Sequence, residues 1–155
     1  MIEILNELKN NYIFMSAGLA WLSAQLIKTF LNFVVTKDFN AERLVGAGGM
    51  PSAHSACVSA LAIATGKRCG ASSAEFAIAF AFACVVIYDA MGVRRAAGEQ
   101  AKVINQLTDT LFRSFGQTGD TFVVSQLKEL LGHTPIEVLA GIILGISVAT
   151  FFKGF

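Results

Sequence analysis

The sequence predicts an all-α integral membrane protein, a helical bundle with about four transmembrane helices and a polar helical hairpin between the third and the fourth. Of its 155 residues, 54% are hydrophobic and 15% are charged, and the mean hydropathy is +0.60. The excess of apolar residues is gathered in a few long runs, which is typical of membrane spans. The length fits one domain, so we expect residues 1–155 to form a single membrane-embedded unit.

The first apolar run covers residues 12–35 and contains a single charge. It is long enough to cross a bilayer core of about 30 Å. The preceding residues carry acidic side chains and form no basic n-region, and the run is too long for a signal h-region, so we expect this segment to be retained and not cleaved as a signal peptide. Ile2, Leu5 and Leu8 follow a helical spacing that predicts a short interfacial helix.

Three further spans are predicted over residues 52–66, 73–91 and 136–152. The second is short and rich in small residues, and Pro51 is expected to be its first helical residue. A glycine-rich loop precedes it, and residues 66–73 form the short return to the third span.

The polar stretch after the third span predicts a helical hairpin. Apolar residues recur at helical spacing on both sides of the turn over residues 116–120, namely Val103, Leu107, Leu111 and Phe115, then Val123, Leu127, Leu130 and Leu131. Each helix has one apolar side, which could lie on the membrane, cover the ends of the spans or bind a partner.

Four spans place the loop over residues 36–51, the hairpin and His133 on one face of the membrane. This face carries more Lys and Arg residues than the other. The positive-inside tendency therefore predicts a bacterial-type inner (plasma) membrane protein whose polar face is cytoplasmic and whose termini are outside. The three scattered cysteines indicate packing, and the absence of a basic run argues against a nucleic-acid partner.

Two cationic or titratable residues stand out near this face. Lys28 lies inside the first span, where a charged ammonium costs about 2.5 to 3.5 kcal/mol on insertion scales, so it turns toward a partner or cavity or else snorkels to the interface. His54 lies in the first turn of the second span, where free backbone N–H groups favour an anion. A packing role at the interface is the plainer interpretation of His54.

His133 comes just before the fourth span. Thr134 and Glu137 have the spacing of a capping box, which explains Glu137 as a helix cap. Glu137 is also four residues after His133, and a carboxylate beside an imidazole fixes its tautomer and raises its basicity. In the same span, Gly141 and Gly145 indicate a close helix contact.

Asp89, Arg94, Arg95 and Glu99 cluster where the third span leaves the membrane. Paired arginines at a span end usually serve as topology anchors. Here, however, they share a face with Lys28 and with both histidines of the chain. Cations that bind an anion's oxygens, together with two imidazoles, suit phosphoryl transfer through a phosphohistidine.

Three stretches carry a resemblance to a known family: "GGMPSAHSA" (48–56), "DAMGVRRAAGEQAKVIN" (89–105) and "ELLGHTPIEVLAGIILG" (129–145). They resemble the divergent branch of the type 2 phosphatidic acid phosphatase and vanadium haloperoxidase superfamily. The resemblance implies a metal-independent and cofactor-independent site in which vanadate mimics phosphate. It implies the following roles: His133 as nucleophile, His54 as acid, Glu137 as the orienting carboxylate, and Lys28, Arg94 or Arg95, Ser52 and, more weakly, Arg43 as phosphate ligands.

The sequence departs from the superfamily pattern in several places. Ala53 replaces the glycine of the P-S-G-H motif, and Glu137 replaces an aspartate. Nearly forty residues separate the arginine pair from His133, where the superfamily has about five. Such an insertion is tolerable if the hairpin loops out of an intact site, because closure entropy grows slowly with loop length. The alternative, if the insertion is not tolerated, is that Asp89, Glu99 and Glu137 hold a divalent ion.

The function predicted from these features is a membrane phosphatase that hydrolyses a lipid phosphate monoester or diphosphate through a phosphohistidine. Two alternatives remain open at the level of sequence: a non-catalytic membrane protein that binds anionic lipid headgroups, and a metal-dependent phosphotransferase. Four short spans enclose little volume, so a homodimer is a further expectation.

Overall fold

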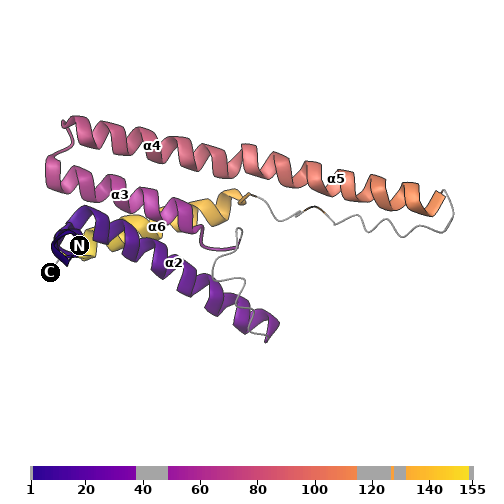
Figure 1. Cartoon of the computed structure of the whole chain (residues 1–155), viewed down its shortest axis with the longest axis horizontal. Helices are drawn as coiled ribbons and strands as arrows, with labels where there is room; N and C mark the ends of the chain where they lie inside the picture. Colours follow the sequence, from indigo (N-terminus) through magenta and orange to yellow (C-terminus); the bar gives the residue numbers. More distant parts are fainter. Residues whose placement is uncertain (1, 38–48, 115–126, 128–131, 154–155) are drawn as a thin grey trace.

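The computed structural model describes residues 2–37, 49–114, 127 and 132–153, and these form six helices and no strand. The predicted all-α class is therefore confirmed. The two ends of the chain lie together at one end of the bundle, and the long helix α5 (Val93–Ser114) projects from the other (Figure 1).

The N-terminal pair consists of α1 (Ile2–Asn10) and α2 (Tyr12–Thr36). Between them Asn11 caps α2, and its side chain accepts hydrogen bonds from the backbone N–H groups of Ile13 and Phe14, both at 3.1 Å. This cap starts the long helix at the residue where the apolar run begins. Leu5 on α1 is exposed, as an interfacial helix would have it.

Helix α3 covers Ala53–Cys69 and lies at the centre of the bundle, in contact with α2, α4 and α6. Its N-cap is Ser52, whose hydroxyl accepts a hydrogen bond from the backbone N–H of Ser55. The prediction that Pro51 begins the helix was therefore wrong. The proline lies before the cap, because the serine hydroxyl satisfies the first free N–H group.

Helices α4 (Ala74–Met91) and α5 are nearly collinear, separated only at Gly92 (Figure 1). The first helix of the predicted hairpin is thus confirmed. Its expected partner, around Val123 to Leu131, lies outside the described residues except for Leu127. Within the described part of the chain, α4 is the only helix that α5 contacts. The described part of α5 therefore does not cover the ends of the other helices.

Helix α6 (Pro135–Phe151) packs most closely against α3. A Cβ atom at Gly141 would collide with the backbone carbonyl of Ser52, and one at Gly145 with that of Ala56. The predicted glycine contact is therefore confirmed, because only glycine lets these two backbones approach so closely. The core around it is built of small side chains, Ala20, Ala24, Ala53, Ala56, Ala60, Ala64 and Ala149.

The large apolar side chains point outward, as they would toward lipid: Leu26, Phe30, Ile78, Phe80, Phe82, Val85 and Ile143 are all exposed. Among the described residues, two segments are long and apolar enough to cross a membrane, Tyr12–Thr36 and Ala74–Thr110. The other two predicted spans, α3 and α6, form helices of 17 residues each. The predicted number of four spans is therefore not confirmed.

Candidate functional site

The two histidines of the chain meet at the end of the bundle that lies away from the termini. His54 is in the first turn of α3 and His133 lies just before α6, yet their ring centroids are 6.4 Å apart. His133 is buried, with 5% of its surface exposed, whereas His54 is exposed. One ring is therefore held by the protein and the other is open to the surroundings.

The backbone that carries His133 returns to the point where α4 ends. The N–H of His133 donates to the carbonyl of Ala90 at 3.0 Å. Gly132 has φ +89°, and a Cβ atom there would collide with the backbone of Arg95. This position therefore requires glycine for both its conformation and its space. The sequence analysis missed Gly132, although a glycine directly before a candidate nucleophile was the available signal.

Glu137 holds the ring of His133 and caps α6 with the same oxygen. Its Oε2 lies 3.1 Å from Nδ1 of His133 and accepts a hydrogen bond from the backbone N–H of Thr134 at 3.0 Å. The Thr134 hydroxyl accepts from the backbone N–H of Glu137 at 3.4 Å, so the capping box is complete. The two predicted interpretations of Glu137 thus hold together.

This contact determines where the proton of His133 resides. An ionised carboxylate only accepts hydrogen bonds, so the ring nitrogen beside Glu137 has to donate. In the neutral ring of His133 we therefore place the proton on Nδ1. The other nitrogen, Nε2, then carries a lone pair. An imidazole with a free Nε2 and a carboxylate behind it is arranged as a nucleophile or a base.

Arg94 and Arg95 differ in their surroundings. The Nε of Arg94 donates to Oδ2 of Asp89 at 2.5 Å, and both side chains line a hollow with His54 and His133. Arg95 contributes its backbone to the contact with Gly132. The structure therefore selects Arg94 as the guanidinium beside the two imidazoles.

In its present form this hollow holds about 20 Å³. That is room for about one water molecule. The side chain of Arg94, one of the residues that line the hollow, is 53% exposed. A phosphate is larger than this space, so it would enter only after lining side chains move.

Lys28 turns inward from α2 and is only 6% exposed. A Cβ atom at Gly49, which has φ +87°, would lie 3.0 Å from the Lys28 Cδ atom, so the glycine makes room for the lysine stem. Desolvation by partial burial, and then the neighbouring Arg94, His133 and Lys28, lower the pKa of His54, while Asp89 raises it. Burial therefore favours the inward orientation of Lys28 over snorkelling, and it places an ammonium group near the histidines.

The sequence of the chain is similar to those of known proteins. The model of the Divergent PAP2 family matches residues 9–148. The chain belongs to this family. It is also 40% identical over 156 residues to "Uncharacterized membrane protein YuiD" of Bacillus subtilis (strain 168), a match that covers 94% of this chain and 99% of that protein. No solved structure matches the chain.

Ser52, one of the predicted phosphate ligands of this divergent PAP2 protein, is not among the residues that line the hollow. The Ser52 hydroxyl is fully buried and accepts hydrogen bonds from the N–H of Ser55 and from its hydroxyl, at 3.3 and 3.0 Å. It serves as a helix cap, and a contact with substrate stays a prediction. Arg43 lies outside the described residues.

The described residues of this protein give no support to the metal-dependent alternative. Within those residues no three His, Cys, Asp or Glu side chains come close enough to hold one ion. Asp89 pairs with Arg94, Glu137 is engaged with His133, and Glu99 is exposed on α5. The three carboxylates therefore do not form a shared site.

Proposed function

We propose that this protein is a membrane phosphatase that hydrolyses a lipid phosphate monoester or diphosphate through a phosphohistidine. The observation that carries the proposal is the pair of imidazoles 6.4 Å apart, one of them held by a carboxylate at 3.1 Å. Membership of the Divergent PAP2 family supports the same class of chemistry.

The spacing of the rings suits an in-line displacement at phosphorus. A nucleophile about 3 to 3.5 Å from phosphorus, and an acid about 3 Å from the leaving oxygen, need the two nitrogens roughly 7 to 8 Å apart. Ring nitrogens lie about 1 Å from their centroids, so a small rotation of exposed His54 would reach this separation from the present geometry. A single phosphoryl group then bridges both rings.

In the first step, Nε2 of His133 attacks phosphorus and forms the N–P bond while the bond from phosphorus to the leaving oxygen breaks. Protonated His54 gives its proton to that oxygen, and the lipid alcohol or monophosphate departs. The positive charge that develops on the ring of His133 is stabilised by the carboxylate of Glu137, which accepts a hydrogen bond from Nδ1–H.

In the second step, water attacks the phosphohistidine. His54, now neutral, takes a proton from the water, the N–P bond breaks, and inorganic phosphate leaves with both rings restored. Arg94 and Lys28 balance the negative charge on the non-bridging oxygens during both steps. Arg94 reaches the anion by leaving Asp89, which is an exchange of one charged partner for another.

The test is turnover of a short-chain phosphatidate by the purified protein in detergent. His133→Ala should abolish turnover, and His54→Ala should lower kcat by about 10²- to 10⁴-fold, the usual contribution of a general acid. Vanadate should inhibit the wild type, and EDTA should leave its rate unchanged. Unchanged turnover in His133→Ala would remove the mechanism, and lipid binding without turnover in the wild type would favour the headgroup-binding alternative.

We further propose that the site faces the cytoplasm of a bacterial-type plasma membrane, because its face carries more Lys and Arg residues. Cys69 is exposed at the end of α3 that lies away from the histidines. In a variant that keeps only this cysteine, an impermeant maleimide should label intact spheroplasts. Labelling that appears only after lysis would reverse the orientation.

A further inference from the structure

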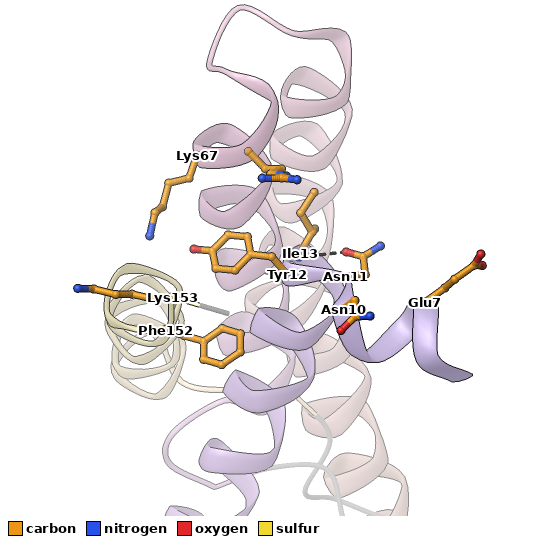
Figure 2. A pocket seen from close by; sticks show the side chains of 9 residues that line it. Glu7, Asn10, Asn11, Tyr12, Ile13, Lys67, Phe152 and Lys153 are labelled. Atoms are coloured by element: carbon orange, nitrogen blue, oxygen red, sulfur yellow. Dashed lines mark hydrogen bonds between the residues drawn. The ribbon is translucent and has the colours of Figure 1, made fainter. Parts of the chain in front are cut away.

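A second pocket lies at the opposite end of the bundle from the histidines. Its volume is about 830 Å³, within the range typical of small-molecule sites. It forms where α1, the start of α2, the last residues of α3 and the residues after α6 meet. Figure 2 shows Glu7, Tyr12, Lys67, Phe152 and Lys153 around it, and Arg68 also lines it. Nothing in the proposed mechanism uses this pocket.

The floor of this pocket, which we call the basal pocket, is fixed by internal contacts. The Tyr12 hydroxyl donates to the carbonyl of Ala149 at 2.7 Å, and its ring stacks on Phe152 with centroids 5.9 Å apart. Lys67 Nζ donates to the same carbonyl at 2.8 Å and lies 5.4 Å from the centroid of the Tyr12 ring. These contacts satisfy the last carbonyls of α6, so Lys67 is mainly structural.

The charge of the basal pocket is unbalanced. Among the described residues that line it, three are cations, Lys67, Arg68 and Lys153, and one, Glu7, carries a carboxylate. Arg68 and Lys153 are exposed, and neither is needed to close α6 as Lys67 is. A basic concavity with two accessible cations is complementary to a phosphate group.

An apolar groove adjoins the basal pocket. It holds about 390 Å³ between α3 and α4, and Ile13 lines both spaces. Its walls include Leu61, Ile78 and Phe82. Glu75 is the one charged residue among the described residues that line it. Ile78 and Phe82 on α4 are exposed, so this wall of the groove is open to lipid chains.

Helix α1 indicates the depth of the basal pocket in the membrane. It exposes Ile4, Leu5 and Leu8 while contributing Glu7 and Asn10 to the pocket wall. A short helix with exposed apolar residues and a charged side lies at the interface, among the headgroups. The cations are therefore at headgroup level, and the groove leads from them toward the bilayer core.

We propose that the basal pocket and its groove bind one anionic phospholipid of the leaflet at this end. Its phosphate would contact Arg68 and Lys153, and one acyl chain would lie along the groove past Ile13. The combination of cations with a continuous apolar groove selects a lipid over a free phosphate, which would use the cations alone. This site is independent of the proposed phosphatase chemistry.

The test is lipid titration of the full-length protein by native mass spectrometry after delipidation. All measurements are made with protein that carries the Arg94→Ala substitution, so that the site near the histidines contributes less to anion binding. We expect palmitoyl-oleoyl phosphatidylglycerol to bind at least tenfold more tightly than the matched phosphatidylcholine. Replacing Arg68 and Lys153 together by glutamine should weaken phosphatidylglycerol binding about 30-fold, since each cation near a membrane surface contributes about a factor of five.

Matched controls separate this site from diffuse attraction. Lys9→Gln removes a cation of α1 that does not line the pocket, and it should leave binding unchanged. Ala79→Phe fills the groove and should weaken the binding of both phosphatidylglycerol and phosphatidylcholine. Ala81→Phe, at an exposed position of the same helix, should leave the binding of both lipids unchanged. Helicity and melting temperature verify that each variant folds.

Three results would overturn the proposal: phosphatidylglycerol binding that survives the double substitution, an equal loss in Lys9→Gln, or binding of chain-free glycerophosphoglycerol as tight as that of the lipid. The first two would reduce the pocket to a topology anchor. The last would make it an anion site without a lipid.

Discussion

Replacing Glu137 by glutamine separates its two structural roles. Glutamine keeps the shape of the side chain and can still accept from the N–H of Thr134, so the capping box survives. The charge beside His133 is lost. The new amide either accepts from Nδ1 as a neutral group or donates to it, and donation moves the ring proton to Nε2, where the nucleophile needs a lone pair.

The size of the effect follows from the geometry. Attack on phosphorus gives the His133 ring a positive charge, and two unit charges about 4 Å apart attract by about 4 kcal/mol at an effective dielectric constant of 20. The side chain of Glu137 is 22% exposed, which screens part of this attraction. We therefore expect kcat to fall by about 10²- to 10³-fold, with the free energy of unfolding nearly unchanged.

The assay compares kcat on short-chain phosphatidate with chemical unfolding for Glu137→Gln and for Thr134→Ala. The threonine variant loses the hydroxyl that accepts from the N–H of Glu137 but keeps the carboxylate on His133. It should lose about 1 kcal/mol of stability and retain its kcat. If Glu137→Gln keeps kcat within threefold of the wild type, Glu137 is a helix cap only and the proposed nucleophile has no orienting group.

Two further predictions concern the arrangement around the hollow. Arg94→Ala should raise the inhibition constant of vanadate at least tenfold, and Arg95→Ala should change it by less than threefold. The reason is that the side chain of Arg94 lines the hollow and that of Arg95 does not. Equal effects of the two substitutions in an inhibition assay would contradict this assignment. Gly132→Ala should lower both kcat and the melting temperature, because the new Cβ atom would collide with the backbone of Arg95 and because residue 132 has φ +89°. A variant with wild-type values would show that the position of His133 does not depend on this contact.

The helices were largely predictable from the sequence because local signals define them. Long apolar runs predicted α2, α4 and α6, and the T-x-x-E pattern located the start of α6 within one residue. The start of α3 was less accurate. The proline signal at residue 51 competed with the serine that follows it, and the serine hydroxyl supplied the cap.

The details of the site were less predictable because they depend on contacts between segments distant in sequence. No local pattern distinguishes Arg94 from Arg95, and the choice follows from the neighbours that α4 and the segment before α6 provide. The burial of Lys28 against Gly49 is likewise a tertiary contact. For Glu137, the sequence suggested two roles as alternatives, and the side chain performs both with one oxygen.

Nearly forty residues separate Arg94 from His133 in the sequence, and the backbone explains how this separation is accommodated. The chain leaves the bundle through α5 and comes back at Gly132, against the backbone of Arg95, with His133 bonded to Ala90. On the way, the Asn105 side chain both donates to the carbonyl of Leu127 and accepts from its N–H, each at 3.0 Å.

The inserted segment therefore begins and ends at nearly the same point. Its length adds little to the cost of closing the site, because closure entropy grows only with the logarithm of loop length. Shortening the excursion while keeping Arg94, Arg95 and the Gly132–His133 junction should then preserve the contact between the two imidazoles. The chemistry of the site is set by where the backbone returns, and the projecting helix is free to serve another purpose.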